Sequence, residues 1–236
     1  MSNMNKSNNI MILGSIALDS IETKYGKEND LLGGSATYAT IAAGIFSSII
    51  PVGIVGDDFP QSGHDIFSKY SYNLNNLITK PGSTFRWGGK YHDNGDDRDT
   101  IFTDLGVFES FDPIINNDDN NVSWVFLANI HPSLQLKVLN QCIDQPKVIL
   151  DTMNLWIETS NNELVEVIKR SDILLLNEKY KLNTITLSID DFYKTLKDRK
   201  KMSKKTSELF LTRGVPGTHD TKILFKCLSR LKNNRF

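Results

Sequence analysis

The sequence Gly14-Ser15-Ile16-Ala17-Leu18-Asp19 is followed, after a short connection, by Leu31-Leu32-Gly33-Gly34-Ser35-Ala36-Thr37-Tyr38, in which two adjacent glycines stand before a predicted helix. Glycine accepts positive φ and leaves room for a ligand to approach the backbone closely. One interpretation is a pocket for a small polar ligand. The other is a loop followed by a helix capped by Ser35. The residues of this stretch alone favour neither.

Apolar runs alternate with amphipathic stretches along the chain, a pattern that predicts parallel strands connected by crossover helices. The predicted strands are Ile10–Leu13, Ile49–Val55, Trp124–Leu127, Lys147–Leu150 and Asp172–Leu176. The predicted helices are 35–47, Pro132–Ile143 and Asn161–Arg170. The expected class is therefore α/β.

Polar residues follow three of these predicted strands: Asp19, Asp151 and Asn177. Ligands of open parallel sheets bind beyond the carboxyl ends of the strands. Each of the three residues alone is more typical of a turn or a helix cap than of a ligand contact. Together they predict a ligand site on the carboxyl edge of the sheet.

The segment 84–108 has a different pattern, with alternating aromatic and aliphatic residues on either side of a polar stretch that contains Asn94-Gly95. Alternation around Asn-Gly predicts a β-hairpin. Within it, Arg86 or Trp87 faces a ligand, or the aromatic side chains only pack the hairpin against its own sheet or that of a partner.

The composition, with 39% hydrophobic and 23% charged residues in 236, is that of an ordinary globular protein. The apolar run 10–18 is too short to cross a bilayer, so we expect a cytoplasmic protein without a membrane partner. Cys142 and Cys227 stand far apart, and the four histidines are scattered. We therefore predict neither a disulfide nor a metal site.

The net charge of −1 hides an uneven distribution, because residues 194–236 contain 13 Lys and Arg against 3 Asp and Glu. A basic tail of this kind binds nucleic acid in some proteins. Here the run 194–205 lacks interleaved aromatic residues, which favours a solvated charged helix or a loose segment and no nucleic-acid partner.

Three segments, Gly14–Asp19, Gly33-Gly34 and Val52–Phe59, resemble the opening of the PfkB (ribokinase-like) carbohydrate kinase family. Three further segments resemble one bacterial subgroup of that family: Thr84–His92, Phe126–Ile130 and Leu150–Trp156. The resemblance implies a ribokinase-like fold, an open, mostly parallel sheet flanked by helices with a small β lid. It also implies ATP-dependent phosphoryl transfer to a hydroxyl of a small sugar or nucleoside, with Mg²⁺, and a possible homodimer through the lid.

The resemblance assigns the hydroxyls of the phosphoryl acceptor to Asp19, Gly33 and Gly34. Tyr38, at a position where many sugar-specific relatives have Asn, and Trp87 of the lid complete the expected acceptor site.

Asn177 and Glu178 are expected near phosphate and magnesium. They belong to Asn177-Glu178-Lys179-Tyr180, which stands in place of the family's NxxE motif, so that Tyr180 replaces the usual Glu.

The sequence departs from the family in its last part, which contains no DTxGAGD-like motif to supply an anion hole and the catalytic base. Gly214–Asp220 is a poor substitute, because Pro216 has no N–H to donate. We therefore assign no catalytic residue and expect a chain that lacks the C-terminal part of the fold through truncation or a frameshift. ATP and Mg²⁺ are implied by the family, and their productive use is not expected here.

The expected organisation is a polar tail over residues 1–9, an α/β core over 10–190 with the lid inserted at about 84–108, and a basic segment over 191–236. Three hypotheses follow for function. The chain is a kinase or a fragment of one, a non-catalytic protein that binds a sugar or dimerises through the lid, or a product that folds poorly.

Overall fold

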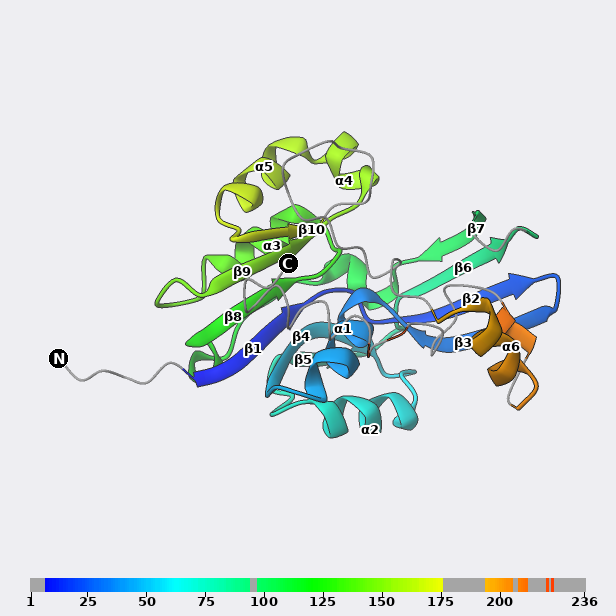
Figure 1. Ribbon diagram of the computed structural model, residues 1–236. Coiled ribbons are helices and arrows are strands. Elements are labelled where there is room, and N and C mark those ends of the chain that lie inside the picture. The colour runs from blue at the N-terminus through cyan, green and yellow to red at the C-terminus, as the bar shows by residue number, and fades with distance from the viewer. Residues whose placement is uncertain are drawn as a thin grey trace, which may run out of the picture. The chain divides into compact units, whose positions relative to one another are not determined.

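The computed structural model describes residues 7–93, 97–175, 194–205, 208–211, 220 and 222 (Figure 1). These residues fall into two compact units. The first takes its residues from 1–18, 32–86 and 104–186, and the second takes them from 19–31, 87–103 and 187–236. The second unit is thus assembled from segments that are far apart in the sequence.

The first unit is built on a six-stranded sheet with the strand order β10-β9-β8-β1-β4-β5. Every neighbouring pair in it is parallel. Its strands are β1 (Ser7–Leu13), β4 (Ile49–Gly56), β5 (Leu77–Lys80), β8 (Val122–Leu127), β9 (Lys147–Asp151) and β10 (Ile173–Leu175). The central strand β1 lies between β8 and β4, so its carboxyl end is flanked by theirs.

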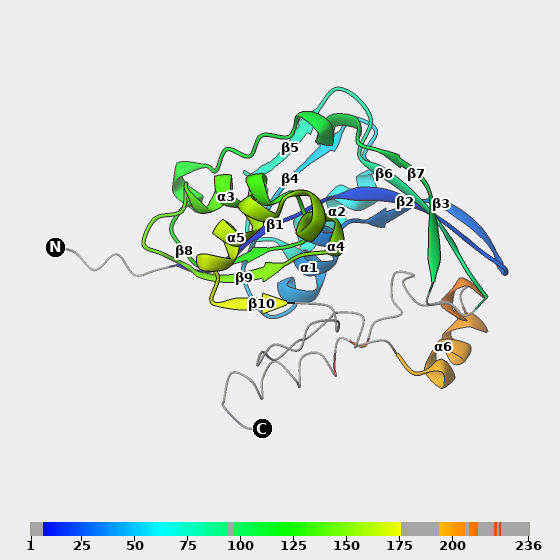
Figure 2. The same cartoon turned by 90° about the horizontal axis from the view of Figure 1, so that it is seen from above.

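Helices cover both faces of this sheet (Figures 1 and 2). They are α1 (Ser35–Gly44), α2 (Gln61–Tyr70), α3 (Pro132–Leu139), α4 (Asn154–Thr159) and α5 (Asn161–Lys169), with the 3₁₀ turns η1 (Gly106–Ser110) and η2 (Asn117–Asp119). Met11 and Leu13 of β1 pack with α3 and α5, whereas Ile12 packs with α1 and α2. This alternation buries β1 on both faces, as expected of a central parallel strand.

The predicted strands and helices are all present, although the helices end earlier than the sequence pattern indicated. The prediction that Ser35 caps α1 is wrong. Gly34 occupies the N-cap position, and Ser35 is the first helical residue. β2, β3, β5 and α2 were not predicted. β3 is exposed over most of its length, and β5 is only 4 residues long.

The second unit contains most of a four-stranded sheet with the order β3-β2-β6-β7. Its strands are β2 (Ala17–Thr23), β3 (Gly26–Gly33), β6 (Arg86–Tyr91) and β7 (Arg98–Asp104). The predicted hairpin over 84–108 is confirmed as β6 and β7, with a bond from the His92 N–H to the Asp97 carbonyl. Its Asn94-Gly95 turn lies outside the described residues. Half of this sheet comes from residues 17–33, which the sequence analysis did not assign to a lid.

The basic segment contributes α6 (Leu196–Ser203) and the 3₁₀ turn η4 (Glu208–Leu211) to the second unit. Thr195 caps α6 by accepting a bond from the Asp198 N–H. Arg199 is buried and donates to the carbonyls of Lys194 and Leu211. The helix was expected to be solvated, but its Arg199 side chain is buried and binds two backbone carbonyls. Among the described residues, no helix is long and apolar enough to span a membrane.

Candidate functional site

The carboxyl ends of β1 and β8 lie side by side, which places two loops together at one edge of the sheet. Leu13 pairs with Leu127, and the Ala128 N–H donates to the Leu13 carbonyl at 2.8 Å. The residues that follow, Gly14-Ser15 after β1 and Asn129 after β8, therefore start from adjacent points. This is the edge at which open parallel sheets bind their ligands.

Ser15 and Ser35 bind each other reciprocally at this edge. The Ser15 N–H donates to Ser35 Oγ at 3.2 Å, and the Ser35 N–H donates to Ser15 Oγ at 3.1 Å. Ser35 Oγ also donates to the Asn129 carbonyl at 3.0 Å. The glycine turn is thus fixed to both neighbouring loops, and the sequence analysis assigned a role in binding to none of these three residues.

Gly34 is required by the backbone itself. Its φ is +92°, and a Cβ there would lie 2.8 Å from Ile16 Cα and even closer to the Ser15 carbonyl oxygen. The segment that approaches Gly34 closely is the chain's own β1–β2 connection, and the approach of a ligand stays a prediction. The loop followed by a helix is confirmed, with Gly34 at the N-cap position in place of Ser35.

Two N–H groups at the amino end of α1 already donate hydrogen bonds within the protein. The N–H groups of Ser35 and Ala36 donate to Ser15 Oγ and to the Ser15 carbonyl. A helix N-terminus binds phosphate through such N–H groups when they are free. These two N–H groups are therefore not available to a phosphate.

The side chain of Asn129 is held by two residues from the loop after β9 and from α4. Trp156 Nε1 donates to Asn129 Oδ1 at 2.8 Å, and Asn129 Nδ2 donates to Met153 Sδ at 3.1 Å. The Trp156 ring meets His131 edge-on, with ring centroids 5.1 Å apart. The loops after β8 and β9 are joined by these contacts.

At the carboxyl end of β4, a hydrogen-bonded network fixes the segment that leads into β6. Thr84 donates to Asp58 Oδ1 through its N–H and its Oγ1, both at 2.7 Å, while Arg86 Nη1 donates to Asp58 Oδ2 at 2.6 Å. Burial opposes ionisation of Asp58, but the bonds from Thr84 and Arg86 outweigh it and lower the pKa of this carboxyl. Thr84 Oγ1 also accepts the Gly56 N–H at 2.9 Å.

Thr84→Val is expected to destabilise the protein by about 1–3 kcal/mol, because it leaves the buried Gly56 N–H without its partner. The free energy of unfolding in urea measures the effect. Thr79→Val in β5, where the threonine is exposed, is the matched control and should change stability by less than about 0.5 kcal/mol. Equal effects of the two substitutions would contradict the role of Thr84 in the network.

Asp19 lies within β2, in the second unit, as a partly buried carboxyl. Burial raises its pKa from the ordinary value of 3.8 to about 7. In the described part of the chain, no group donates a hydrogen bond to this carboxylate. Strongly shifted carboxyl pKa values gather at functional sites, which makes Asp19 a candidate binding group.

Tyr38 and Trp87 have different surroundings. Tyr38 is a half-buried residue of α1, in the first unit. Trp87 belongs to the second unit, where its Nε1 donates to Thr100 Oγ1 at 3.4 Å and Arg98 lies over its ring at 5.6 Å from the centroid. The ring covers Gly89 so closely that a Cβ there would overlap it. Trp87 thus packs on its own sheet, and its contribution to acceptor binding stays a prediction.

Of the remaining predicted positions, Asp151 lies within the described residues, and Asn177 and Glu178 do not. Asp151 ends β9 on the carboxyl edge, as predicted, and is half-buried. Asn177 and Glu178, the expected phosphate and magnesium residues, lie outside the described residues. Within the described residues, no group of three or more His, Cys, Asp or Glu is arranged to hold a metal ion.

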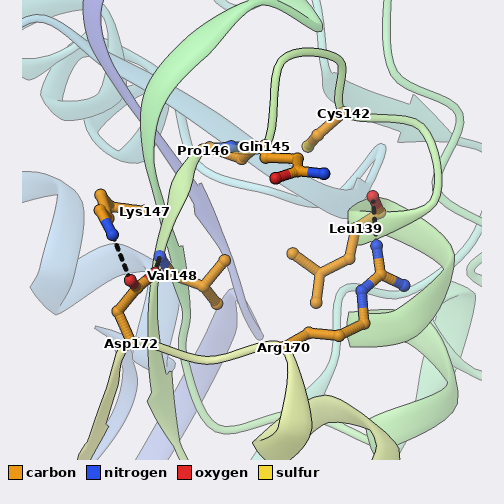
Figure 3. Close-up of a pocket in the computed structure, with 8 residues that line it drawn as sticks. All are labelled: Leu139, Cys142, Gln145, Pro146, Lys147, Val148, Arg170 and Asp172. Carbon is orange, nitrogen blue, oxygen red and sulfur yellow. Dashed lines mark hydrogen bonds and ion pairs between the residues drawn. The ribbon is translucent and has the colours of Figure 1, made fainter.

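A pocket of about 360 Å³ lies at the opposite edge of the sheet, by the amino end of β9 (Figure 3). Its charged groups are satisfied by protein partners. Lys147 Nζ pairs with Asp172 at 2.5 Å, and Arg170 donates to Asn140 Oδ1 and to the Leu139 carbonyl. Burial raises the pKa of the Cys142 thiol to about 11, which keeps it protonated and unreactive. This pocket is not a candidate for the chemistry.

Comparison with solved structures gives consistent fold-level matches. A nucleoside kinase of the ribokinase family from Methanocaldococcus jannaschii matches with a TM-score of 0.56 and 19% identity, over 79% of this chain and 67% of that one. A ribokinase from Cryptococcus neoformans in complex with ADP matches with a TM-score of 0.58 and 16% identity, over 73% of this chain and 57% of that one. The chain has the ribokinase fold.

A third structure with this fold is the nucleoside kinase of Burkholderia thailandensis in complex with inosine, with a TM-score of 0.57 and 14% identity, over 72% of this chain and 60% of that one. Among curated proteins, the "Probable ATP-dependent kinase TDA10" of Saccharomyces cerevisiae is 47% identical over 49 residues. That match spans 20% of this chain and only 17% of the yeast protein. No family model matches the sequence. The ribokinase-like fold implied by the sequence resemblance is confirmed.

Proposed function

We propose that the chain binds a small hydroxylated acceptor, a sugar or a nucleoside, of the kind that ribokinase-type kinases phosphorylate with ATP. Asp19, Gly33 and Gly34 bind its hydroxyls, with Tyr38 and Trp87 as further acceptor-binding residues. The observation that supports this most is the Asp19 carboxylate, which is partly buried and has no donor among the described residues. Acceptor hydroxyls would supply the missing donors, and a hydrogen bond to a charged group is worth about 1.5–3 kcal/mol.

The locked edge around Ser15 and Ser35 supports the same proposal from the first unit. Its loops are fixed by backbone and hydroxyl hydrogen bonds within the protein itself. A preformed site loses less conformational entropy when it binds. Structures of similar fold include kinases in complex with inosine and with ADP, which is consistent with a small acceptor and with ATP as the family's phosphoryl donor.

We further propose that this chain by itself binds the acceptor without acceptor-dependent consumption of ATP. Phosphoryl transfer needs stabilisation of charge on the transferred group as well as a positioned hydroxyl. The 236 residues contain no DTxGAGD-like motif for the first of these tasks. The second task, positioning of the hydroxyl, is the one for which the described residues are suited.

A thermal-shift screen with neutral sugars and nucleosides tests the binding proposal. A ligand present at about 100 times its Kd stabilises by about 2.7 kcal/mol, which corresponds to a rise in Tm of roughly 5–10 °C for a chain of this size. ADP release in the presence of ATP, Mg²⁺ and the ligand is expected to equal the background without ligand. A screen without a single shift would contradict acceptor binding, and acceptor-dependent ADP release would contradict the absence of turnover.

A further inference from the structure

The side chain of Asn129 is oriented by the protein but is not fully used by it. Trp156 Nε1 is only a donor, so its 2.8 Å contact must be to the amide oxygen of Asn129. This contact fixes which end of the amide is Nδ2. The Asn129 donor group therefore has a defined direction, away from Trp156 and toward Met153.

Further contacts of Trp156 and of the Asn129 backbone support this orientation of the Asn129 amide. Trp156 packs edge-on against His131, whose Nδ1 accepts the Ser133 N–H and whose Nε2 lies 3.1 Å from Ser160 Oγ. The Asn129 backbone is fixed separately by Ser35, through the bond to its carbonyl. Both the backbone and the amide of Asn129 are therefore held in place at the carboxyl edge of the sheet.

The partner of the Asn129 donor is a weak one. Nδ2 points to the thioether sulfur of Met153 at 3.1 Å, and a thioether accepts hydrogen bonds poorly. Met153 is 40% exposed, and methionine is flexible enough to change its position easily. An oxygen atom that displaced the Met153 sulfur would gain a full hydrogen bond from an amide that is already oriented.

We propose that Asn129 is a specificity-determining residue that donates a hydrogen bond from Nδ2 to an oxygen of an uncharged acceptor, with Met153 moving aside to form an apolar wall of the site. This inference rests on the proposed function and adds a residue to it. The contacts described around Asn129 are made by hydroxyl, indole and thioether groups. Arg86, the first residue of β6, is ion-paired with Asp58, which follows the carboxyl end of β4. This chemistry selects a neutral hydroxylated ring over a sugar phosphate.

The variant Asn129→Asp tests the proposal, because it keeps an oxygen to accept the Trp156 N–H but replaces the Nδ2 donor by an acceptor. The Kd of a neutral ligand found in the screen, measured by calorimetry, is expected to rise roughly tenfold to a hundredfold. Asn140→Asp is the matched control, since this exposed residue also accepts a hydrogen bond through Oδ1, from Arg170, and gains the same charge. Its Kd should stay within about twofold of the wild type.

Side-chain amide resonances of the wild-type protein give a second readout that does not depend on how the variant folds. The Asn129 amide signal, assigned through bonds, is expected to shift on titration with the neutral ligand, while the Asn140 signal stays in place. An unchanged Asn129 signal and an unchanged Kd for Asn129→Asp, with a wild-type protein that does bind, would overturn this inference and leave the proposed function standing. A wild-type protein that binds no neutral ligand overturns both.

Discussion

At pH 8, Asp19→Asn is expected to be more stable than the wild-type protein and at the same time unable to bind the acceptor. The pKa of Asp19 is raised from 3.8 to about 7 by burial, so its ionised form is disfavoured in the folded state. A shift of this size corresponds to about 4 kcal/mol, taken as an upper limit. Asparagine keeps the shape of the side chain without the charge, and so removes this cost.

The sign of the pH dependence follows from the direction of the shift. A carboxyl whose pKa is higher in the folded protein than in the unfolded chain binds its proton more tightly when folded. The stability it contributes is complete below the unfolded pKa of 3.8 and is lost as the pH rises through about 7. Wild type and Asp19→Asn should therefore be nearly equal in stability at pH 4, and should diverge up to pH 8.

Urea unfolding at pH 4, 6 and 8 measures this divergence. Asp118→Asn, which changes an exposed carboxylate of η2, is the matched control and should follow the wild-type protein at each pH. If Asp19→Asn were no more stable than wild type at pH 8, Asp19 would not be a desolvated carboxylate without a donor. The main support for its role as a hydroxyl-binding group would then be lost.

Gly34→Ala is expected to have the largest effect on stability in the first unit. The backbone at Gly34 has φ 92° and ψ 149°, a region that essentially only glycine occupies, and a Cβ there would overlap the Ser15 carbonyl. Strain of about 1–3 kcal/mol adds to an overlap of similar cost, which gives a loss of roughly 3–5 kcal/mol. The free energy of unfolding in urea measures it.

Gly26→Ala separates the two contributions to this loss. Gly26 also has a positive φ, of 147°, but a Cβ there would meet no atom within 4 Å. This control should cost only the backbone strain, about 1–3 kcal/mol. A Gly34→Ala variant no less stable than Gly26→Ala would show that the Ser15 carbonyl does not press on Gly34, and the preformed turn would have to be abandoned.

The parallel sheet could be predicted from the sequence because its strands are buried on both faces. β4 is buried along its whole length and gives a continuous apolar run, whereas β3 is exposed over Gly26–Asp30 and gives no pattern at all. Periodicity reports burial, so elements with little burial leave little signal in the sequence.

Within the candidate site, the sequence could predict only a residue whose own backbone conformation limits which amino acid can stand there. Gly34 is such a residue, because its backbone conformation and its close neighbour both exclude other residues. Asn129 is not, since its importance comes from Trp156, which lies 27 residues further along the chain. The position of Asp19 within β2, rather than after β1, also depends on pairing between segments that the sequence does not show to be neighbours.

The most direct test of the account is calorimetric titration of the wild-type protein with a neutral acceptor at several pH values between 5 and 9. If acceptor hydroxyls donate to ionised Asp19, binding should be saturable, with an affinity that rises about tenfold per pH unit below pH 7 and levels off above it. Absence of binding at every pH, or an affinity that does not change with pH, would contradict the claim that Asp19 is held without a donor in order to bind the acceptor.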